Sequence, residues 1–434
     1  MDQLTALVSK ANSFIWGLYC LIPLLCGTGL YFTLRLNFVQ IRKFAMAFKY
    51  TFGQLTIFGE RAGKDGMSSF QALATAIAAQ VGTGNLAGAA TAIAMGGPGA
   101  IFWMWIAAFF GMATIFAEAV LAQVYKEKMP DGSVVGGPAY YISRGLKSNG
   151  LAVFFSVAII MALGFIGNMV QSNSIADAFN NAFGVNRLLI GVIVAAIGGF
   201  VFFGGMGRIA SITEKIVPIM AAGYLLGGLY ILVTHASHII PAFGMVFEGA
   251  FNPAAATGGL IGATMKEAIR YGVARGLFSN EAGMGSTPHA HAVAKVKDPA
   301  EQGFVAIMGV FVDTFLVLNM TAFVIFVTGA IDGKTSGIAL TQSAFSTIVG
   351  WYFFGEQNVK FLFGNKGLTP YRIVVMAFVV LGATLKLDLV WELADFFNGI
   401  MVFPNLIALI GLSKVVSEAL NHFDDQGRLK ANTK

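Results

Sequence analysis

The sequence has few charged residues. Only 12% of its 434 residues are charged and 56% are hydrophobic, whereas a soluble domain carries roughly 25% charged residues. This scarcity excludes a soluble protein and predicts an all-α polytopic protein that lies in a lipid bilayer. The 53 glycines and 39 phenylalanines suit closely packed membrane helices, in which small residues let backbones approach and aromatic rings fill the gaps.

Cysteines and linker sequences are also scarce. Cys20 and Cys26 lie six residues apart in one apolar segment, so we expect them to be packing residues. No proline- or serine-rich linker divides the chain, which predicts a single transmembrane domain over 1–434. No run of Lys and Arg precedes a short apolar core at the N-terminus, so no removable signal is expected. The net charge of +6 is expected to come from cytoplasmic loops, and we expect no nucleic-acid partner.

Long apolar runs recur along the chain. The first, 14–34, precedes a basic stretch that the positive-inside rule places in the cytoplasm, so the N-terminus is predicted to be outside. Ten more runs give 11 crossings of the inner or plasma membrane and a cytoplasmic C-terminus. The polar tail, 413–434, is expected to be loosely ordered. We expect the ten runs at about 69–95, 101–124, 151–182, 188–203, 216–233, 258–286, 304–330, 338–363, 371–385 and 389–412.

Two of these runs contain the same interruption, Asn-x-Ala-Gly shortly after a glycine. It occurs at Gly82 to Gly88 and at Gly276 to Gly283. Gly, Asn and Ser weaken a helix, and freed backbone at membrane depth is tolerated only where it lines a cavity. Without the first helix, the interrupted runs open two groups of five helices, 66–235 and 255–412. Because five is odd, the second group is inverted, which predicts a secondary transporter whose two breaks meet at the midplane.

The residues of both breaks suit a zwitterion. Free N–H groups bind a carboxylate, while carbonyl and amide oxygens bind an ammonium or sodium ion. A helix kink for close packing is the alternative for one break alone, but two matched breaks favour a binding site. In the first break we expect donors from Gly82, Thr83 and Gly84, and oxygens from Gln80, Val81 and Asn85. In the second we expect polar oxygens beside a small apolar wall, from Gly276, Leu277, Phe278, Ser279 and Asn280.

Other polar residues allow a structural or a functional interpretation. Glu118 and Asp313 are intramembrane acids, which are functional candidates by default, although each could simply secure a neighbouring helix. Glu281 is expected to bond loose N–H groups of the second break. His289 and His291 are expected in a solvated cytoplasmic loop, because a metal site needs more converging ligands. A cytoplasmic gating pair is expected among Glu267, Arg270 and Arg275.

One segment resembles a family signature. Gly96 to Gly111 reads GGPGAIFWMWIAAFFG and resembles the signature of the alanine or glycine:cation symporter family. Gln80 to Gly88, Gly137 to Ile142 and Leu277 to Thr287 also resemble blocks of that family, within a similarity that runs from about Phe14 to Leu412.

The resemblance implies a leucine-transporter type of fold with one extra N-terminal helix. It implies uptake of alanine or glycine coupled to Na+, with no other metal and no cofactor. It further implies that the substrate is lined by Phe165, Asn168 and Trp351, in addition to the breaks. The implied sodium ligands join the first broken helix to hydroxyl groups of a later helix, at Ala78, Val81, Asn85, Ser346 and Thr347.

Alternatives of other classes stay open at this point. A proton-coupled amino acid transporter, an ion channel and an amino acid sensor could share the same fold. A membrane enzyme is disfavoured because the titratable residues occupy separate segments with no nucleophile, metal or cofactor motif. The chain also departs from the family, because an additional apolar stretch between the segments resembling 339–342 and 346–351 is absent here. That absence leaves open a truncated helix at 338–363.

Overall fold

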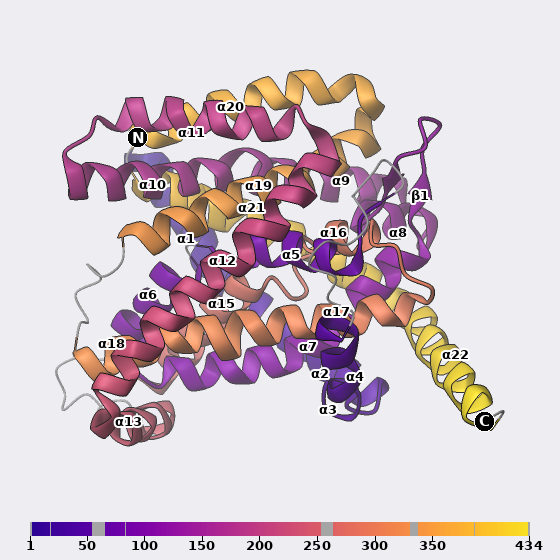
Figure 1. The fold of residues 1–434 in the computed structure, drawn as a ribbon, viewed down its shortest axis with the longest axis horizontal. Helices are drawn as coiled ribbons and strands as arrows, with labels where there is room; N and C mark the ends of the chain where they lie inside the picture. Colours follow the sequence, from indigo (N-terminus) through magenta and orange to yellow (C-terminus); the bar gives the residue numbers. More distant parts are fainter. Residues whose placement is uncertain are drawn as a thin grey trace.

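A computed structural model describes residues 2–17, 19–53, 66–82, 84–252, 264–329, 337–385 and 387–432. These residues form a bundle in which long helices run side by side (Figure 1). Their only sheet is a two-stranded antiparallel ribbon of β1 (Glu127–Lys128) and β2 (Val134–Val135). The expected all-helical architecture is therefore confirmed for the described part of the chain.

The first part of the bundle contains the predicted interruption near Gly82. Its helices are α1 (Asp2–Ile15), α2 (Leu21–Arg35), α3 (Val39–Arg42), α4 (Phe44–Phe52), α5 (Ser69–Gln80), the π-helix η1 (Gly84–Gly88), α6 (Ala89–Gly96), α7 (Ala100–Val124), α8 (Pro138–Arg144), α9 (Asn149–Ile159), the π-helix η2 (Ile160–Gly167), α10 (Asn168–Phe183), α11 (Arg187–Phe202) and α12 (Gly205–Thr234).

The second part contains the other interruption. Its helices are η3 (Ala236–His238), α13 (Ile239–Phe251), α15 (Met265–Asn280), α16 (Pro288–Ala292), α17 (Pro299–Val310), the π-helix η4 (Phe311–Leu318), α18 (Asn319–Thr328), α19 (Gly337–Phe363), η5 (Gly364–Gly367), α20 (Leu368–Thr384), α21 (Leu387–Gly411) and α22 (Ser413–Asn432). In Figure 1, α10, α11 and α20 lie together along one edge of the bundle, and these three helices contact one another.

Several described stretches of helix are long and apolar enough to cross a membrane. The two interrupted runs are not among them because each break divides its helix, and Leu21–Arg35 and Arg187–Phe202 are apolar but shorter. The expected total of 11 crossings stays a prediction. The six stretches are Ala100–Val124, Asn149–Phe183, Gly205–Thr234, Pro299–Thr328, Ala344–Thr384 and Val390–Gly411.

Glycines set the closest approaches between helices. A Cβ atom on Gly272 of α15 would lie 2.4 Å from the carbonyl oxygen of Ala100 in α7. A Cβ atom on Gly303 of α17 would lie 2.7 Å from the ring of Phe116, also in α7. Larger residues would push these helices apart, so α7 sits in the core between α15 and α17 because glycine stands at both contacts.

Two expectations about the ends of the chain are wrong. The first apolar run is not one helix over 14–34, because α1 ends at Ile15 and α2 begins at Leu21, with a turn at Gly17 between them. The tail is a helix as far as Asn432, not a loose segment. Val416 and Leu420 are buried, and α22 contacts α7 and α17, with Phe423 against Phe304, before it extends from the bundle (Figure 1).

The region around Ser346 contains no truncated helix. α19 runs without interruption over 27 residues, which at 1.5 Å per residue is about 40 Å, long enough to span a bilayer. Thr341 and Gln342 lie in the same helix as Ser346 and Trp351. The two segments between which the sequence analysis notes a missing stretch are therefore joined within one continuous helix.

Candidate functional site

The first break lies where the sequence predicted it. α5 begins with a capping box in which Ser68 and Gln71 bond each other's backbone N–H groups, and it ends at Gln80. Val81 leaves the helix with ψ at 79°, and helical structure resumes at Gly84. Thr83, an expected donor, is outside the described residues.

The second break lies later than expected. Gly276, Leu277, Phe278, Ser279 and Asn280 all belong to α15, and the non-helical segment runs from 281 to 287. Its backbone has positive φ at Glu281, Gly283 and Gly285. Glu281 leaves the helix in the left-handed conformation. Glycine adopts positive φ at little cost, so Gly283 and Gly285 continue the non-helical segment, whereas the earlier Gly276 packs against Met104 of α7.

The two breaks meet. The side-chain amide of Gln80 donates to the carbonyl oxygen of Asn280 at 2.7 Å. A Cβ atom on Gly84 would lie 3.3 Å from Cα of Ser279 and 3.6 Å from the ring of Phe278. Broken helices that are almost 200 residues apart in sequence are thus brought into direct contact, as the repeat pattern predicted.

A buried carboxylate joins both helices at this contact. Asp313 accepts hydrogen bonds from the amide nitrogen of Asn85 at 2.7 Å, from the hydroxyl of Ser279 at 3.1 Å and from that of Thr314 at 2.9 Å. All four residues are buried. Asp313 stands in the π-helix η4, a local widening of a helix that is frequent at functional sites. The carboxylate and neighbouring hydroxyls are hard oxygen ligands of the kind that sodium prefers.

The first broken helix also meets α19. Thr347 donates its hydroxyl to the carbonyl oxygen of Ala78 at 3.0 Å. A Cβ atom on Gly82 would lie 2.5 Å from the same hydroxyl, so only glycine fits there. Ser346 instead contacts the sulfur of Met220 in α12, at 3.7 Å. The structure therefore brings Ala78, Gly82 and Thr347 together.

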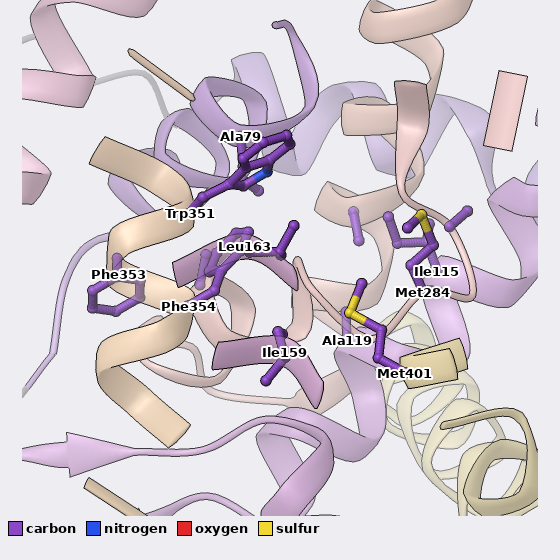
Figure 2. Packing of buried hydrophobic residues seen from close by; sticks show 14 of the residues in the cluster. Ala79, Ile115, Ala119, Ile159, Leu163, Met284, Trp351, Phe353, Phe354 and Met401 are labelled. Atoms are coloured by element: carbon purple, nitrogen blue, oxygen red, sulfur yellow. The ribbon is translucent and has the colours of Figure 1, made fainter. Parts of the chain in front are cut away.

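Trp351 connects α19 to both breaks. Its indole N–H donates to Glu281 at 2.8 Å, and the other oxygen of Glu281 accepts from Ser286 at 2.6 Å. Figure 2 shows the indole directed toward Ala79 of α5. A Cβ atom on Gly167 would lie 2.7 Å from the ring, so η2 closes against its face.

Glu118 has the role expected of Glu281. Its two carboxylate oxygens accept the N–H groups of Gly283 at 3.0 Å and Gly285 at 2.9 Å, and Asn405 donates to it at 2.7 Å. Met284 lies between those glycines and packs near Ile115, Ala119 and Met401 (Figure 2). The signal for this role was a single acid in an apolar helix, but its partners could not be read from the sequence.

The two histidines are not in a solvated loop. His289 and His291 are each about 1% exposed. The Nδ1 atom of His289 bonds the carbonyl oxygen of Ser286 at 2.6 Å, and its Nε2 atom bonds the amide of Asn358 at 2.8 Å. The expectation failed because α16, a single turn, is covered by α5, α7 and α19.

The remaining predicted substrate residues divide into two groups. Phe165 stacks on Phe378 of α20, with ring centroids 4.9 Å apart, and no described contact brings it to the breaks. Asn168 is fully buried, and its side-chain oxygen has no hydrogen-bond partner in the described structure. The same holds for the side-chain oxygen of Gln80. Buried acceptors without donors are costly, so each of these oxygens has capacity for a further donor.

Backbone donors in the first break are already partly used. The N–H of Gly82 donates to the carbonyl oxygen of Gln80 at 2.9 Å and to the side chain of Asn85 at 3.3 Å. Gly82 therefore differs from the free donor expected from the sequence.

Comparisons with known proteins identify the family of this chain. The profile of the sodium:alanine symporter family matches residues 1–434. The chain belongs to this family. It is 44% identical to the sodium/alanine symporter AgcS of Methanococcus maripaludis, over 97% of each chain. It is 42% identical to the probable sodium/glutamine symporter GlnT of Bacillus subtilis, over 97% of this chain and 91% of that one.

Membership of the sodium:alanine symporter family shows which class of protein this is. The protein is a multi-pass membrane transporter, not an enzyme, and Na+ is the coupling ion of its family. The amino-acid carrier protein AlsT of Bacillus subtilis is also similar, at 40% identity over 97% of this chain. The alignment with AgcS spans 448 positions, more than the 434 residues of this chain. The aligned part of AgcS therefore contains residues that this chain lacks.

Proposed function

We propose that this chain carries a small neutral amino acid, alanine or glycine, into the cell together with Na+ by alternating access. The contact between the two broken helices carries this proposal. A buried carboxylate, that of Asp313, and the unpaired side-chain oxygen of Gln80 lie at this contact, and such groups are otherwise excluded from a membrane interior.

The substrate would lie between the breaks. Its carboxylate would face the backbone at Gly84, where helical structure resumes after the first break and the dipole of η1 begins. Its ammonium would bind the oxygens of Gln80 and Asn168, which lack partners. The close approach of Gly84 to Phe278 and Ser279 disfavours a substrate with a long side chain at this contact. Trp351 would close the site from α19.

Sodium would bind at two groups of oxygens. The first contains the carbonyl of Ala78 and the hydroxyl of Thr347, which are 3.0 Å apart and can turn to one cation. Val81 and Ser346 lie near this pair in sequence, and Ser346 would have to turn from Met220 to join it. The second is the carboxylate of Asp313 with its neighbours Asn85 and Ser279. Because these ligands stand on the same helices as the substrate site, sodium and amino acid would stabilise each other's binding, which is the thermodynamic basis of coupling.

The proposed architecture is an inverted repeat of the leucine-transporter type with 11 crossings and an outside N-terminus. Each proposed group, 66–235 and 255–412, begins with a broken helix and ends with a helix that contains an internal proline, Pro218 in α12 and Pro404 in α21. Equivalent irregularities at equivalent places support a repeated unit.

Uptake into proteoliposomes tests the proposed function. We expect radiolabelled alanine to accumulate under an inward Na+ gradient and not under a choline gradient at matched pH and voltage, and unlabelled glycine to compete. Accumulation against the alanine gradient would exclude a channel. Equal uptake in Na+ and choline by a folded protein would refute sodium-coupled transport of this substrate.

A further inference from the structure

A basic cluster lies outside the candidate site, where α11 and α19 end and α12 and α20 begin. Its members are Arg208 in α12, Lys360 in α19, Lys366 in η5 and Arg372 in α20. On the predicted topology, the runs 188–203 and 338–363 end on the cytoplasmic side, and the run 371–385 begins there. The basic cluster is therefore expected at the cytoplasmic border of the bilayer, where positive charges are enriched.

Two aromatic residues at the end of α11 bring the arginines to one face of that helix. The guanidinium of Arg208 lies over the ring of Phe200, 4.2 Å from its centroid, and that of Arg372 lies over the ring of Phe203, at 5.5 Å. Residues three positions apart are neighbours on a helix surface. Because α20 packs along α11, a residue of α20 reaches the same face as a residue of α12.

The charges of the basic cluster are not balanced. The buried carboxylate of Glu356 lies 2.8 Å from the ammonium of Lys360 and 3.7 Å from the guanidinium of Arg372, so two cations share one anion. A second carboxylate, that of Asp131, lies near η5, where Asn365 donates to it at 2.7 Å. Four cations thus face two carboxylates, which leaves an excess of positive charge.

The surface beside the cations is apolar and exposed. Phe200 is 65% exposed, Phe203 is 52% exposed and Phe363, at the end of α19, is 66% exposed. In a bilayer such rings contact lipid, and arginine heads that lie over them reach the headgroups while their stems stay on apolar surface. Arg372 keeps 15% of its side chain exposed, and Arg208 is also partly exposed, so both can bind a headgroup.

We propose that the basic cluster binds an anionic phospholipid of the cytoplasmic leaflet. The phosphate accepts hydrogen bonds from the guanidinium groups of Arg208 and Arg372, whose planar donors fit phosphate oxygens. Lys366, which is exposed, adds a further positive charge. The acyl chains lie against the rings of Phe200 and Phe203. The excess of positive charge selects a lipid with a net negative charge over a zwitterionic one.

The bound lipid is expected to stabilise the helices behind the candidate site. It joins α11, α12 and α20, which follow one another at this surface. Tyr371, next to Arg372, donates its hydroxyl to the carbonyl oxygen of Tyr352 in α19 at 3.1 Å. A Cβ atom on Gly164 of η2 would lie 2.7 Å from the same hydroxyl. A ligand that binds the folded state raises the melting temperature, so the anionic lipid should do so.

Native mass spectrometry of the purified full-length protein tests the proposal. The protein is titrated in detergent with phosphatidylglycerol or with phosphatidylcholine of the same acyl chains. We expect one tightly bound phosphatidylglycerol per chain and only weak binding of phosphatidylcholine. The double variant Arg208→Gln/Lys366→Gln should lower the affinity for phosphatidylglycerol about 30-fold, because it removes two charges from the headgroup site. It leaves the contacts of Glu356 with Lys360 and Arg372 in place.

A matched double variant is the control. Arg42→Gln/Lys414→Gln removes the same total charge from two exposed positions on the same predicted side of the membrane and should keep the wild-type affinity. Melting curves with each lipid provide a second measurement, in which phosphatidylglycerol alone should raise the midpoint of the wild type.

Three results would overturn the proposal. Equal affinity of the wild type for the two lipids would show that no headgroup charge is recognised, and this comparison needs no variant that folds. An equal loss of affinity in the two double variants would show a general effect of net charge. Displacement of phosphatidylglycerol by millimolar inorganic phosphate would show that the basic cluster takes free phosphate and has no specific lipid site.

Discussion

Replacing Thr347 by valine tests the first sodium site most directly. The substitution removes one hydroxyl and keeps the branched shape of the side chain. Thr347 is fully buried, and its hydroxyl lies 3.0 Å from the carbonyl oxygen of Ala78. Gly82 lies directly against the same hydroxyl. No neighbouring side chain therefore has space to move in and supply the lost oxygen.

The expected magnitude follows from the chemistry of the hydroxyl. A polar contact to a charged group in a buried site contributes about 1.5–3 kcal/mol. Since about 1.4 kcal/mol corresponds to a factor of ten, the sodium concentration for half-maximal uptake should rise about 10- to 150-fold. The carbonyl of Ala78 also loses a donor, which costs about 1–3 kcal/mol of stability, so the melting temperature should fall as well.

The assay is a sodium titration of alanine uptake in proteoliposomes at constant ionic strength. Thr347→Ser keeps the hydroxyl and should retain most of the sodium affinity. Thr234→Val makes the same chemical change at an exposed position of α12, where the hydroxyl bonds only its own helix and the adjacent His235, and should behave as the wild type.

The two effects of the valine can be separated. A role in packing alone would lower the melting temperature and leave the sodium dependence unchanged. A half-maximal sodium concentration within twofold of the wild-type value in Thr347→Val, at normal folding, would therefore refute the assignment of this hydroxyl to a sodium site.

Three further predictions follow from individual contacts. Asp313→Asn removes the only charge of the second oxygen cluster, so the half-maximal sodium concentration should rise at least about tenfold, and a fall in melting temperature alone would contradict the assignment. Glu118→Gln replaces one of the two acceptor oxygens by an NH2 group, so one N–H of the second break loses its acceptor and the protein should be destabilised by about 2 kcal/mol. Thermal melting in detergent measures this loss; an unchanged melting temperature would show that Glu118 does not hold the break. Gly99→Ala would place a Cβ 2.0 Å from the backbone of Gly249 and should lower the stability of the fold by about 1–3 kcal/mol. In the control Gly227→Ala the new Cβ meets open space, so the change should be neutral or stabilising by up to about 1 kcal/mol. Equal melting temperatures for these two variants would refute the close contact of α7 and α13.

Much of the candidate site was predictable because its signals are local. The interruption at Gly82 is visible as small and polar residues within an apolar run, and such residues weaken a helix wherever they occur. The second interruption was predicted in the correct run, but its start was placed at Gly276 and not at Glu281. Both Gly276 and Gly283 permit a break, and the packing of Gly276 against Met104 keeps the first of them helical.

Other features depended on partners that are distant in sequence. Glu118 bonds two N–H groups that are 165 and 167 residues away, and nothing near Glu118 in the chain indicates them. The burial of His289 depends likewise on helices that cover α16. Phe165 has a sequence context suited to a substrate wall, but the rotation of its helix directs the ring toward α20.

The sequence by itself determined the membrane class, the positions of most helices and the presence of two matched breaks, because hydrophobicity and helix propensity are properties of short segments. The tertiary structure alone decided which side chains converge: Asp313 with Asn85 and Ser279, Thr347 with Ala78, and Arg275 with Asp395. The physical reason is that each helix can rotate about its axis and slide along its neighbours without a change in its own pattern. Only the packing of all helices together, with glycines at the closest contacts, fixes those rotations and so assembles the site.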